Sequence, residues 1–142
     1  MPANLELWIT ANDALKHDAG AATADRLYRR LKLVATLLDE VPNEAKGPRL
    51  IWRKQSGGVE TMAVDRLLVI GRDPKCDLVL DEPKVSRRHC TVTPAGRGFA
   101  LNDLGSTNGT KVNSALVQGH ALQNGDVIEV GRQAIAFVLI TD

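Results

Sequence analysis

The stretch "SRRHCTVTPAGRGFALNDLGSTNGTKVN" (residues 86–113) alternates short strand-like runs with clusters of turn-forming residues. Within it, "RHCTVT" (88–93) and "FALNDL" (99–104) carry the apolar and β-branched side chains, and "PAGRG" and "GSTNG" follow them. Runs of this length bounded by Gly, Pro, Asn and Ser are typical of β-strands joined by tight loops. We therefore predict two neighbouring strands in this stretch.

The same pattern extends to both sides of the stretch. "RLIWRKQ" (49–55) and "VETMAV" (59–64) flank a Gly-Gly pair and predict a hairpin. Further strands are predicted at residues 66–71, 77–80, 126–131 and 134–140. Many short strands separated by turns predict an all-β sandwich of two antiparallel sheets. In such a fold we expect the functional residues in loops at one end, held by a rigid frame.

The loop at residues 105–110 holds more small and polar residues than a chain reversal requires. A two-residue turn is enough to join two strands, and Asn108-Gly109 alone would supply one. Ser106 and Thr107 are therefore surplus to the turn. We interpret the surplus as the lining of a ligand site.

Three motifs occur in a fixed order: "GRDPKCDLVL" (71–80), "SRRHCTV" (86–92) and "LGSTNGTKVN" (104–113). Together they resemble the forkhead-associated (FHA) domain, whose pattern is Gly-Arg ending one strand, Ser-x-x-His opening another, and a later turn with Asn-Gly. The resemblance covers roughly residues 48–142. It implies a sandwich of about eleven strands that binds phosphothreonine peptides through loops at one end. The chain departs from the family at Asn113-Ser114, where Asn-Gly is common.

The residues in these motifs suit a phosphate ligand. A phosphate monoester carries close to two negative charges near neutral pH and three acceptor oxygens, and it is bound best by a guanidinium with neutral donors beside it. The resemblance implies that Arg72, Ser86 and Thr107 contact the phosphate. It also implies that Arg87 contacts the phosphate or the peptide, and that Asn108 hydrogen-bonds the peptide main chain.

Three further motif residues are expected to support the site without touching the ligand. The ring of His89 is expected to bond backbone groups between the loops. Gly71 and Gly109 are expected to serve backbone conformation. The resemblance also implies a small pocket for the threonine methyl group, which would favour phosphothreonine over phosphoserine.

The first 47 residues have a different composition and predict a helical extension. In residues 22–41 the apolar side chains recur at steps of three and four, which places on one helical stripe Ala24, Leu27, Leu31, Val34, Leu38 and Val41. Thr23 is a plausible N-cap and Pro42 a stop signal. Residues 5–18 are a weaker helix prediction, and residues 42–48 are interpreted as a linker. We divide the chain into an extension (1–47) and an FHA domain (48–142).

The extension leaves three roles open. The stripe could pack on the chain's own domain, dock to a partner helix, or mediate self-association through residues 22–41. Thr10 is followed three residues later by Asp13. A phosphorylated Thr10 could therefore bind the chain's own site or that of a neighbouring copy.

Composition limits the classes of partner. The net charge is +1, and Lys and Arg balance Asp and Glu in both parts, six against seven in residues 1–47 and twelve against ten in 48–142. A nucleic-acid-binding surface would need a clear basic excess. Cys76 and Cys90 fit no metal spacing or disulfide framework. We expect a reduced, cytoplasmic protein with no cofactor, metal, nucleic-acid partner or membrane segment.

These observations favour one function and leave an alternative. The favoured hypothesis is a phosphothreonine-dependent adaptor that acts with a Ser/Thr kinase. The alternative is a phosphate-independent scaffold whose main interface is the helical extension. An enzyme is disfavoured, because Ser86, His89 and Asp103 form no G-x-S-x-G elbow and the chain has neither a P-loop nor a His-Glu-x-x-His site.

Overall fold

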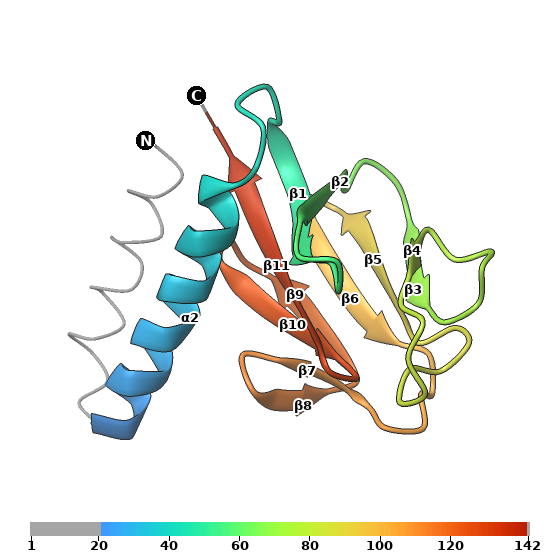
Figure 1. Ribbon diagram of the computed structural model, residues 1–142. Helices are drawn as coiled ribbons and strands as arrows, with labels where there is room; N and C mark the ends of the chain where they lie inside the picture. Colours follow the sequence, from blue (N-terminus) through green and yellow to red (C-terminus); the bar gives the residue numbers. More distant parts are fainter. Residues whose placement is uncertain (1–20, 142) are drawn as a thin grey trace.

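The computed structural model describes residues 21–141, which form one helix and eleven strands (Figure 1). The helix is α2 (Ala21–Asp39). The strands are β1 (Gly47–Arg53), β2 (Val59–Ala63), β3 (Leu68–Gly71), β4 (Leu78–Val79), β5 (Cys90–Ala95), β6 (Gly98–Asp103), β7 (Thr110–Val112), β8 (Ala115–Val117), β9 (Gly119–Leu122), β10 (Asp126–Val130) and β11 (Gln133–Ile140). The predicted helix at residues 5–18 and the Thr10 site lie outside the described residues.

The strands form two sheets, which confirms the predicted sandwich. The six-stranded sheet has the order β2-β1-β11-β10-β7-β8, and the five-stranded sheet has the order β4-β3-β5-β6-β9. The predicted hairpin is present, since β1 pairs antiparallel with β2 from Arg49↔Ala63 to Arg53↔Val59. One pair of strands differs from the predicted antiparallel arrangement, because the two-residue strand β4 runs parallel to β3.

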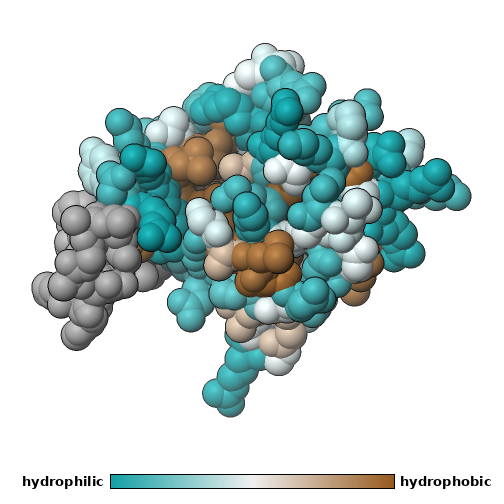
Figure 2. All heavy atoms as spheres, turned by 90° about the horizontal axis from the view of Figure 1, so that it is seen from below, coloured by the Kyte–Doolittle hydropathy of each residue, from teal (hydrophilic) through white to brown (hydrophobic). Residues whose placement is uncertain are grey.

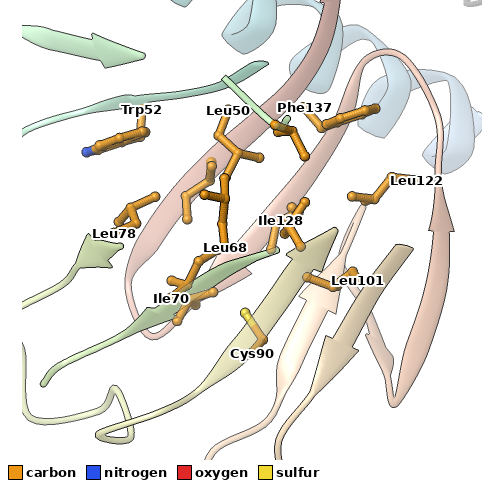
Figure 3. Close-up of a cluster of buried hydrophobic side chains, with 14 of the residues drawn as sticks. Leu50, Trp52, Leu68, Ile70, Leu78, Cys90, Leu101, Leu122, Ile128 and Phe137 are labelled. Carbon is orange, nitrogen blue, oxygen red and sulfur yellow. The ribbon is translucent and has the colours of Figure 1, made fainter. Parts of the chain in front are cut away.

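A single apolar core fills the space between the sheets (Figure 3). Leu50, Ile128 and Phe137 point into it from the six-stranded sheet, and Ile70 and Leu101 from the five-stranded sheet, and all five are completely buried. The period of two along each strand explains this arrangement, because alternate side chains face the opposite sheet. The core fixes the loops at the ends of the sandwich.

Helix α2 covers the outer face of the six-stranded sheet. Val34 and Leu37 are 1% and 2% exposed and belong to a second cluster with Ile51, Ala136 and Val138. The predicted stripe therefore includes a residue that contacts the sheet, Val34, but it omits Leu37. Leu37 is the most deeply buried leucine among the described residues of the helix. The helix packs on its own domain.

The ends of the helix differ slightly from the prediction. The helix already includes Ala21, so Thr23 is inside it and is not the N-cap, and it ends at Asp39, three residues before Pro42. Ala45 is buried, and Gly47 starts β1 opposite Ile140. The predicted linker is therefore a short connection whose last residues belong to the sheet.

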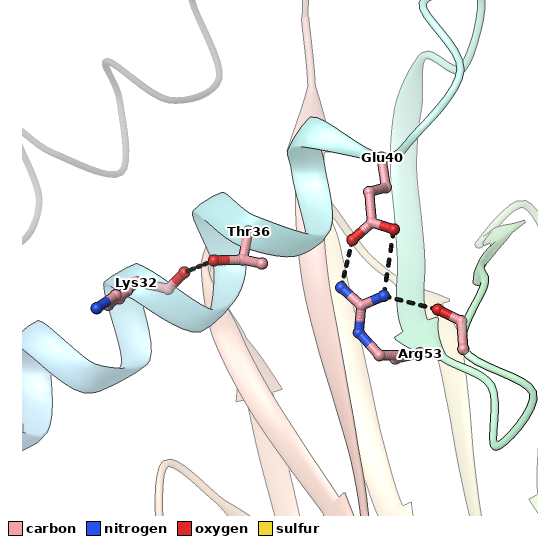
Figure 4. Close-up of polar contacts among 5 residues, drawn as sticks. Lys32, Thr36, Glu40 and Arg53 are labelled. Carbon is pink, nitrogen blue, oxygen red and sulfur yellow. Dashed lines mark hydrogen bonds and ion pairs between the residues drawn. The ribbon is translucent and has the colours of Figure 1, made fainter.

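A salt bridge joins the end of α2 to β1 (Figure 4). The Arg53 guanidinium donates to both carboxylate oxygens of Glu40 and also donates to the Gly57 carbonyl oxygen over 2.7 Å. The hydrogen bond from Arg53 lowers the pKa of the Glu40 carboxyl. Figure 4 also shows the Thr36 hydroxyl donating to the Lys32 carbonyl oxygen, one turn earlier in the helix.

Two structural properties bear on the sequence predictions. Within residues 21–141 no helix combines the length and apolar character that a membrane span requires. Among the same residues, no group of His, Cys, Asp and Glu side chains is arranged to hold a metal ion, and Cys76 and Cys90 are free thiols. Burial raises the pKa of the Cys90 thiol to about 12.

Candidate functional site

The three sequence motifs meet at one end of the sandwich, the lower end in Figure 1. Strand β3 ends at Gly71, where β5 begins, because Ile70 pairs with Cys90. Cys90 in turn pairs with Asp103, the last residue of β6. The connections at residues 72–89, which include the short strand β4, and at residues 104–109 therefore leave the sheets side by side.

Arg72 is exposed and is held by the neighbouring loop. Its backbone N–H donates to the Ser86 carbonyl oxygen over 3.0 Å, and its side-chain Nε donates to the Val85 carbonyl oxygen over 3.1 Å. Among the described residues, the Val85 carbonyl oxygen is the only group that the Arg72 side chain contacts by a hydrogen bond. The two terminal nitrogens of the guanidinium therefore remain as donors for a ligand.

Gly71 allows the two loop segments to approach closely. A Cβ atom at this position would lie 2.2 Å from the Arg87 carbonyl oxygen. That same oxygen accepts hydrogen bonds from the Asp73 N–H over 3.1 Å and from the Cys76 thiol over 3.2 Å. Any larger residue at position 71 would push residues 86–87 away from the end of β3.

His89 lies completely buried between the two loops. Its Nδ1 accepts a hydrogen bond from the Ser86 N–H over 3.1 Å, and Nε2 lies 2.8 Å from the Gly109 carbonyl oxygen. Because Nδ1 acts as an acceptor, the ring proton must be on Nε2, where it is donated to Gly109. The imidazole is thus committed to the backbone on both sides, which is incompatible with a Ser86–His89–Asp103 catalytic arrangement.

Ser86, Thr107 and Asn108 come together where the loops touch. The Thr107 N–H donates to the Ser86 Oγ over 3.1 Å, which leaves the hydroxyl proton of Ser86 for a ligand. The Asn108 Nδ2 donates to the Lys84 carbonyl oxygen over 2.9 Å. The bond to Lys84 fixes the orientation of the amide, and its Oδ1 remains as an acceptor.

Arg87 occupies a less constrained place. Its carbonyl oxygen is fixed against residues 71–76, but its guanidinium is exposed and forms no hydrogen bond with a described residue. The structure therefore brings Arg72, Ser86, Thr107 and Asn108 into one contact network and places the Arg87 side chain beside that network. Viewed from below, this end of the molecule is mostly hydrophilic, with a few separate hydrophobic areas (Figure 2).

Asp103 organises the loop at residues 104–109, a role that the sequence analysis missed. One carboxylate oxygen accepts from the hydroxyls of Ser106 and Thr110 over 2.6 and 2.7 Å, and the other accepts from the N–H groups of Gly105 and Ser106 over 3.0 Å each. Burial opposes ionisation of this carboxyl, but the four hydrogen bonds outweigh it and lower its pKa. The signal was an acidic residue followed three positions later by Ser, a common turn pattern.

Comparison with known proteins identifies the fold family. The FHA domain family model matches residues 68–131. The oxoglutarate dehydrogenase inhibitor of Corynebacterium efficiens is 31% identical over 126 residues, which are 89% of this chain and 82% of that protein. The chain belongs to the FHA-domain family.

Other relatives and solved structures of FHA domains match shorter regions. The glycogen accumulation regulator GarA of Mycolicibacterium smegmatis is 41% identical over 68 residues, which are 48% of this chain and 43% of that protein. An FHA domain solved in a study of phosphothreonine-dependent FHA interactions has 34% identity and a TM-score of 0.60, covering 68% of this chain and all of that one. The FhaA FHA domain, solved with the intracellular domain of Rv3910, has 37% identity and a TM-score of 0.56, covering 63% and 98%.

Proposed function

We propose that this FHA protein is a phosphothreonine-dependent protein-interaction module, an adaptor that recognises the product of a Ser/Thr kinase. The observation that carries the proposal is the contact between the Ser86 Oγ and the Thr107 N–H, 3.1 Å apart, directly beside the loop that holds Arg72. This contact joins neutral donors of two loops, and the hydrogen bond from Arg72 to Val85 keeps a cation on the segment beside them, which supports binding of a phosphate monoester.

In this proposal each residue has a separate task. The terminal nitrogens of Arg72, the hydroxyl of Ser86 and Thr107 bind the phosphate oxygens. Arg87 adds a second positive charge near the phosphate or the peptide, and Asn108 bonds the peptide main chain through the amide that Lys84 orients. A phosphothreonine is preferred over phosphoserine because its methyl group buries additional apolar area, an effect of about 1 kcal/mol.

The names of the relatives are consistent with regulation by binding. One group is named for inhibiting oxoglutarate dehydrogenase and another for regulating glycogen accumulation. We propose that this chain likewise acts by binding a partner protein, and not by catalysis. In the site itself, both nitrogens of His89 are occupied by backbone groups, so this ring does not provide a general base.

The packing of α2 is consistent with the domain division proposed from the sequence. We propose that residues 48–142 form the FHA domain and that residues 1–47 are an extension. Helix α2 belongs to this extension and packs on the outer face of the six-stranded sheet. The alternative of a scaffold built on the helix is not favoured, because the side chains that would form its interface, Val34 and Leu37, are buried against the chain's own sheet.

The experiment that tests the proposal is a titration with a degenerate phosphothreonine peptide library, using unphosphorylated and phosphoserine libraries of the same composition as controls. We expect binding of phosphothreonine peptides in the micromolar range, equivalent to roughly −7 to −8 kcal/mol. Equal binding of the phosphorylated and plain libraries would refute the adaptor function.

A further inference from the structure

A cavity of about 360 Å³ lies between α2 and the outer face of the six-stranded sheet, away from the proposed phosphate-binding loops. Its lining comes from three elements: α2, strand β10 and the turn between β7 and β8. The lining residues are Arg26, Leu27, Arg29, Arg30, Leu33, Asn113, Ser114, Val127 and Glu129. Figure 1 shows this turn pointing toward α2. Small-molecule sites typically have volumes of about 300–1,000 Å³.

The lining combines an apolar part with an excess of positive charge. Leu27, Leu33 and Val127 supply the apolar part, and three arginines face a single acidic residue, Glu129. Arg29 is paired with Asp25 over 2.8 Å on the helix surface. The other two arginines form neither a hydrogen bond nor an ion pair with any described residue.

Arg30 is the unusual member of this set. It is half-buried, and burial lowers the pKa of its guanidinium, while the Asp126 carboxylate acts in the opposite direction. Asp126 forms no ion pair with Arg30, and its oxygens accept instead from the Asn113 amide, the Gln123 N–H and the His120 ring over 3.0, 2.8 and 3.1 Å. A partly buried cation that forms no ion pair with a described residue is unfavourable, and an anion in the cavity would reduce that cost.

We propose that this cavity binds a small amphiphilic anion, an apolar body with one carboxylate or similar oxyanion head. The head pairs with Arg30, with Arg26 beside it on the helix, and the apolar body lies against Leu33 and Val127. The site is separate from the phosphothreonine site, and it would make the docked position of α2 sensitive to a ligand, because its lining belongs to both the helix and the sheet.

The test is a titration of the full chain with octanoate as the probe and with 1-octanol as its uncharged counterpart. Binding is measured by two-dimensional amide NMR. We expect octanoate to shift the amide signals of Ser114, Val127 and Glu129 in a saturable way, and octanol to bind about tenfold more weakly. Arg30→Gln should weaken octanoate binding about tenfold, and Arg30→Lys, which keeps the charge, should retain most of it.

Arg97→Gln is the matched control, because it removes the same charge from the exposed turn between β5 and β6. It should leave octanoate binding unchanged. Equal binding of octanol and octanoate, unchanged binding in Arg30→Gln, or shifts confined to other residues would each overturn the proposal. Phosphothreonine-peptide affinity measured on the same Arg30 variants should not change, so a failure here is distinct from a failure of the adaptor function.

Discussion

His89 donates a hydrogen bond from Nε2 to the Gly109 carbonyl oxygen over 2.8 Å, and so joins the two loops that carry the candidate site. The opposite nitrogen of the same ring holds the backbone of Ser86. One fully buried side chain therefore sets the distance between the Ser86 hydroxyl and the Thr107–Asn108 turn.

His89→Ala should destabilise the fold and weaken phosphopeptide binding together. The substitution removes the histidine partner of the partly buried Ser86 N–H and Gly109 carbonyl oxygen and opens a cavity, at a combined cost of about 3–5 kcal/mol. Urea unfolding gives the stability loss and peptide titration gives the affinity. A variant with near wild-type stability would show that the ring is not the link between the loops.

Asp103→Asn should loosen the loop at residues 104–109. The amide group would place N–H donors where the carboxylate now accepts from Ser106 and Thr110, and we expect a loss of about 1–3 kcal/mol in unfolding free energy. Denaturation of the wild type and Asp103→Asn at pH 7 measures this loss. Equal stability would contradict the role of Asp103 as the organiser of the loop.

The lowered pKa of Asp103 also predicts a pH dependence. A carboxyl whose pKa is lower in the folded state stabilises the protein above its unfolded pKa, which is about 4. That stabilisation disappears as the pH falls from about 4 through the folded pKa. The stability difference between wild type and Asp103→Asn should therefore shrink as the pH falls through this range, and a difference that stays constant would refute the assignment.

Ser114→Gly should stabilise the protein. Asn113 and Ser114 have φ angles of 51° and 73°, so both turn residues between β7 and β8 adopt the left-handed conformation that glycine accepts without strain. We expect a gain of up to about 1 kcal/mol in thermal or urea unfolding, reduced by the greater entropy of glycine in the unfolded chain. A loss of stability would mean that the Ser114 side chain makes a larger contribution than the strain.

Leu37→Ala tests whether α2 is part of the folded domain. Leu37 is 2% exposed against the outer sheet, whereas Leu33 on the same helix is 37% exposed. Leu37→Ala should lower the unfolding free energy by about 2–4 kcal/mol, and the control Leu33→Ala by about 0.5 kcal/mol. Light scattering should show an unchanged molecular mass in both variants. A fall in mass of Leu37→Ala with little loss of stability would instead assign the Leu37 face of α2 to self-association.

The sandwich could be predicted because its longer strands carry continuous apolar runs between strong turn signals, as at residues 134–140. The strands β7, β8 and β9 could not be predicted individually, because they have only three or four residues and turn residues such as Asn113-Ser114 and Gly119 interrupt them. The start of β1 was hidden by Gly47 and Pro48, which suggest a linker when their pairing with Ile140 and Leu139 is unknown.

The sequence motifs predict which residues line the candidate site, but they do not predict how these residues bond to one another. The motifs identified Arg72, Ser86, Thr107 and Asn108, which the structure places in one network. The role of Asp103 depends on the loop folding back over its carboxylate, which no periodic pattern reports. Leu37 was missed for a related reason. The sheet that a helix contacts decides which face of the helix is buried, and the helix sequence alone does not fix that face.

The most direct test of the account is isothermal titration of one phosphothreonine peptide, selected from the library, into the wild type, Arg72→Ala and the control Arg97→Ala. We predict that Arg72→Ala weakens binding by about 2–4 kcal/mol, because a phosphate loses its charged partner, while Arg97→Ala binds like the wild type. If Arg72→Ala instead bound the peptide as tightly as the wild type, the converging loops would not be the phosphate site.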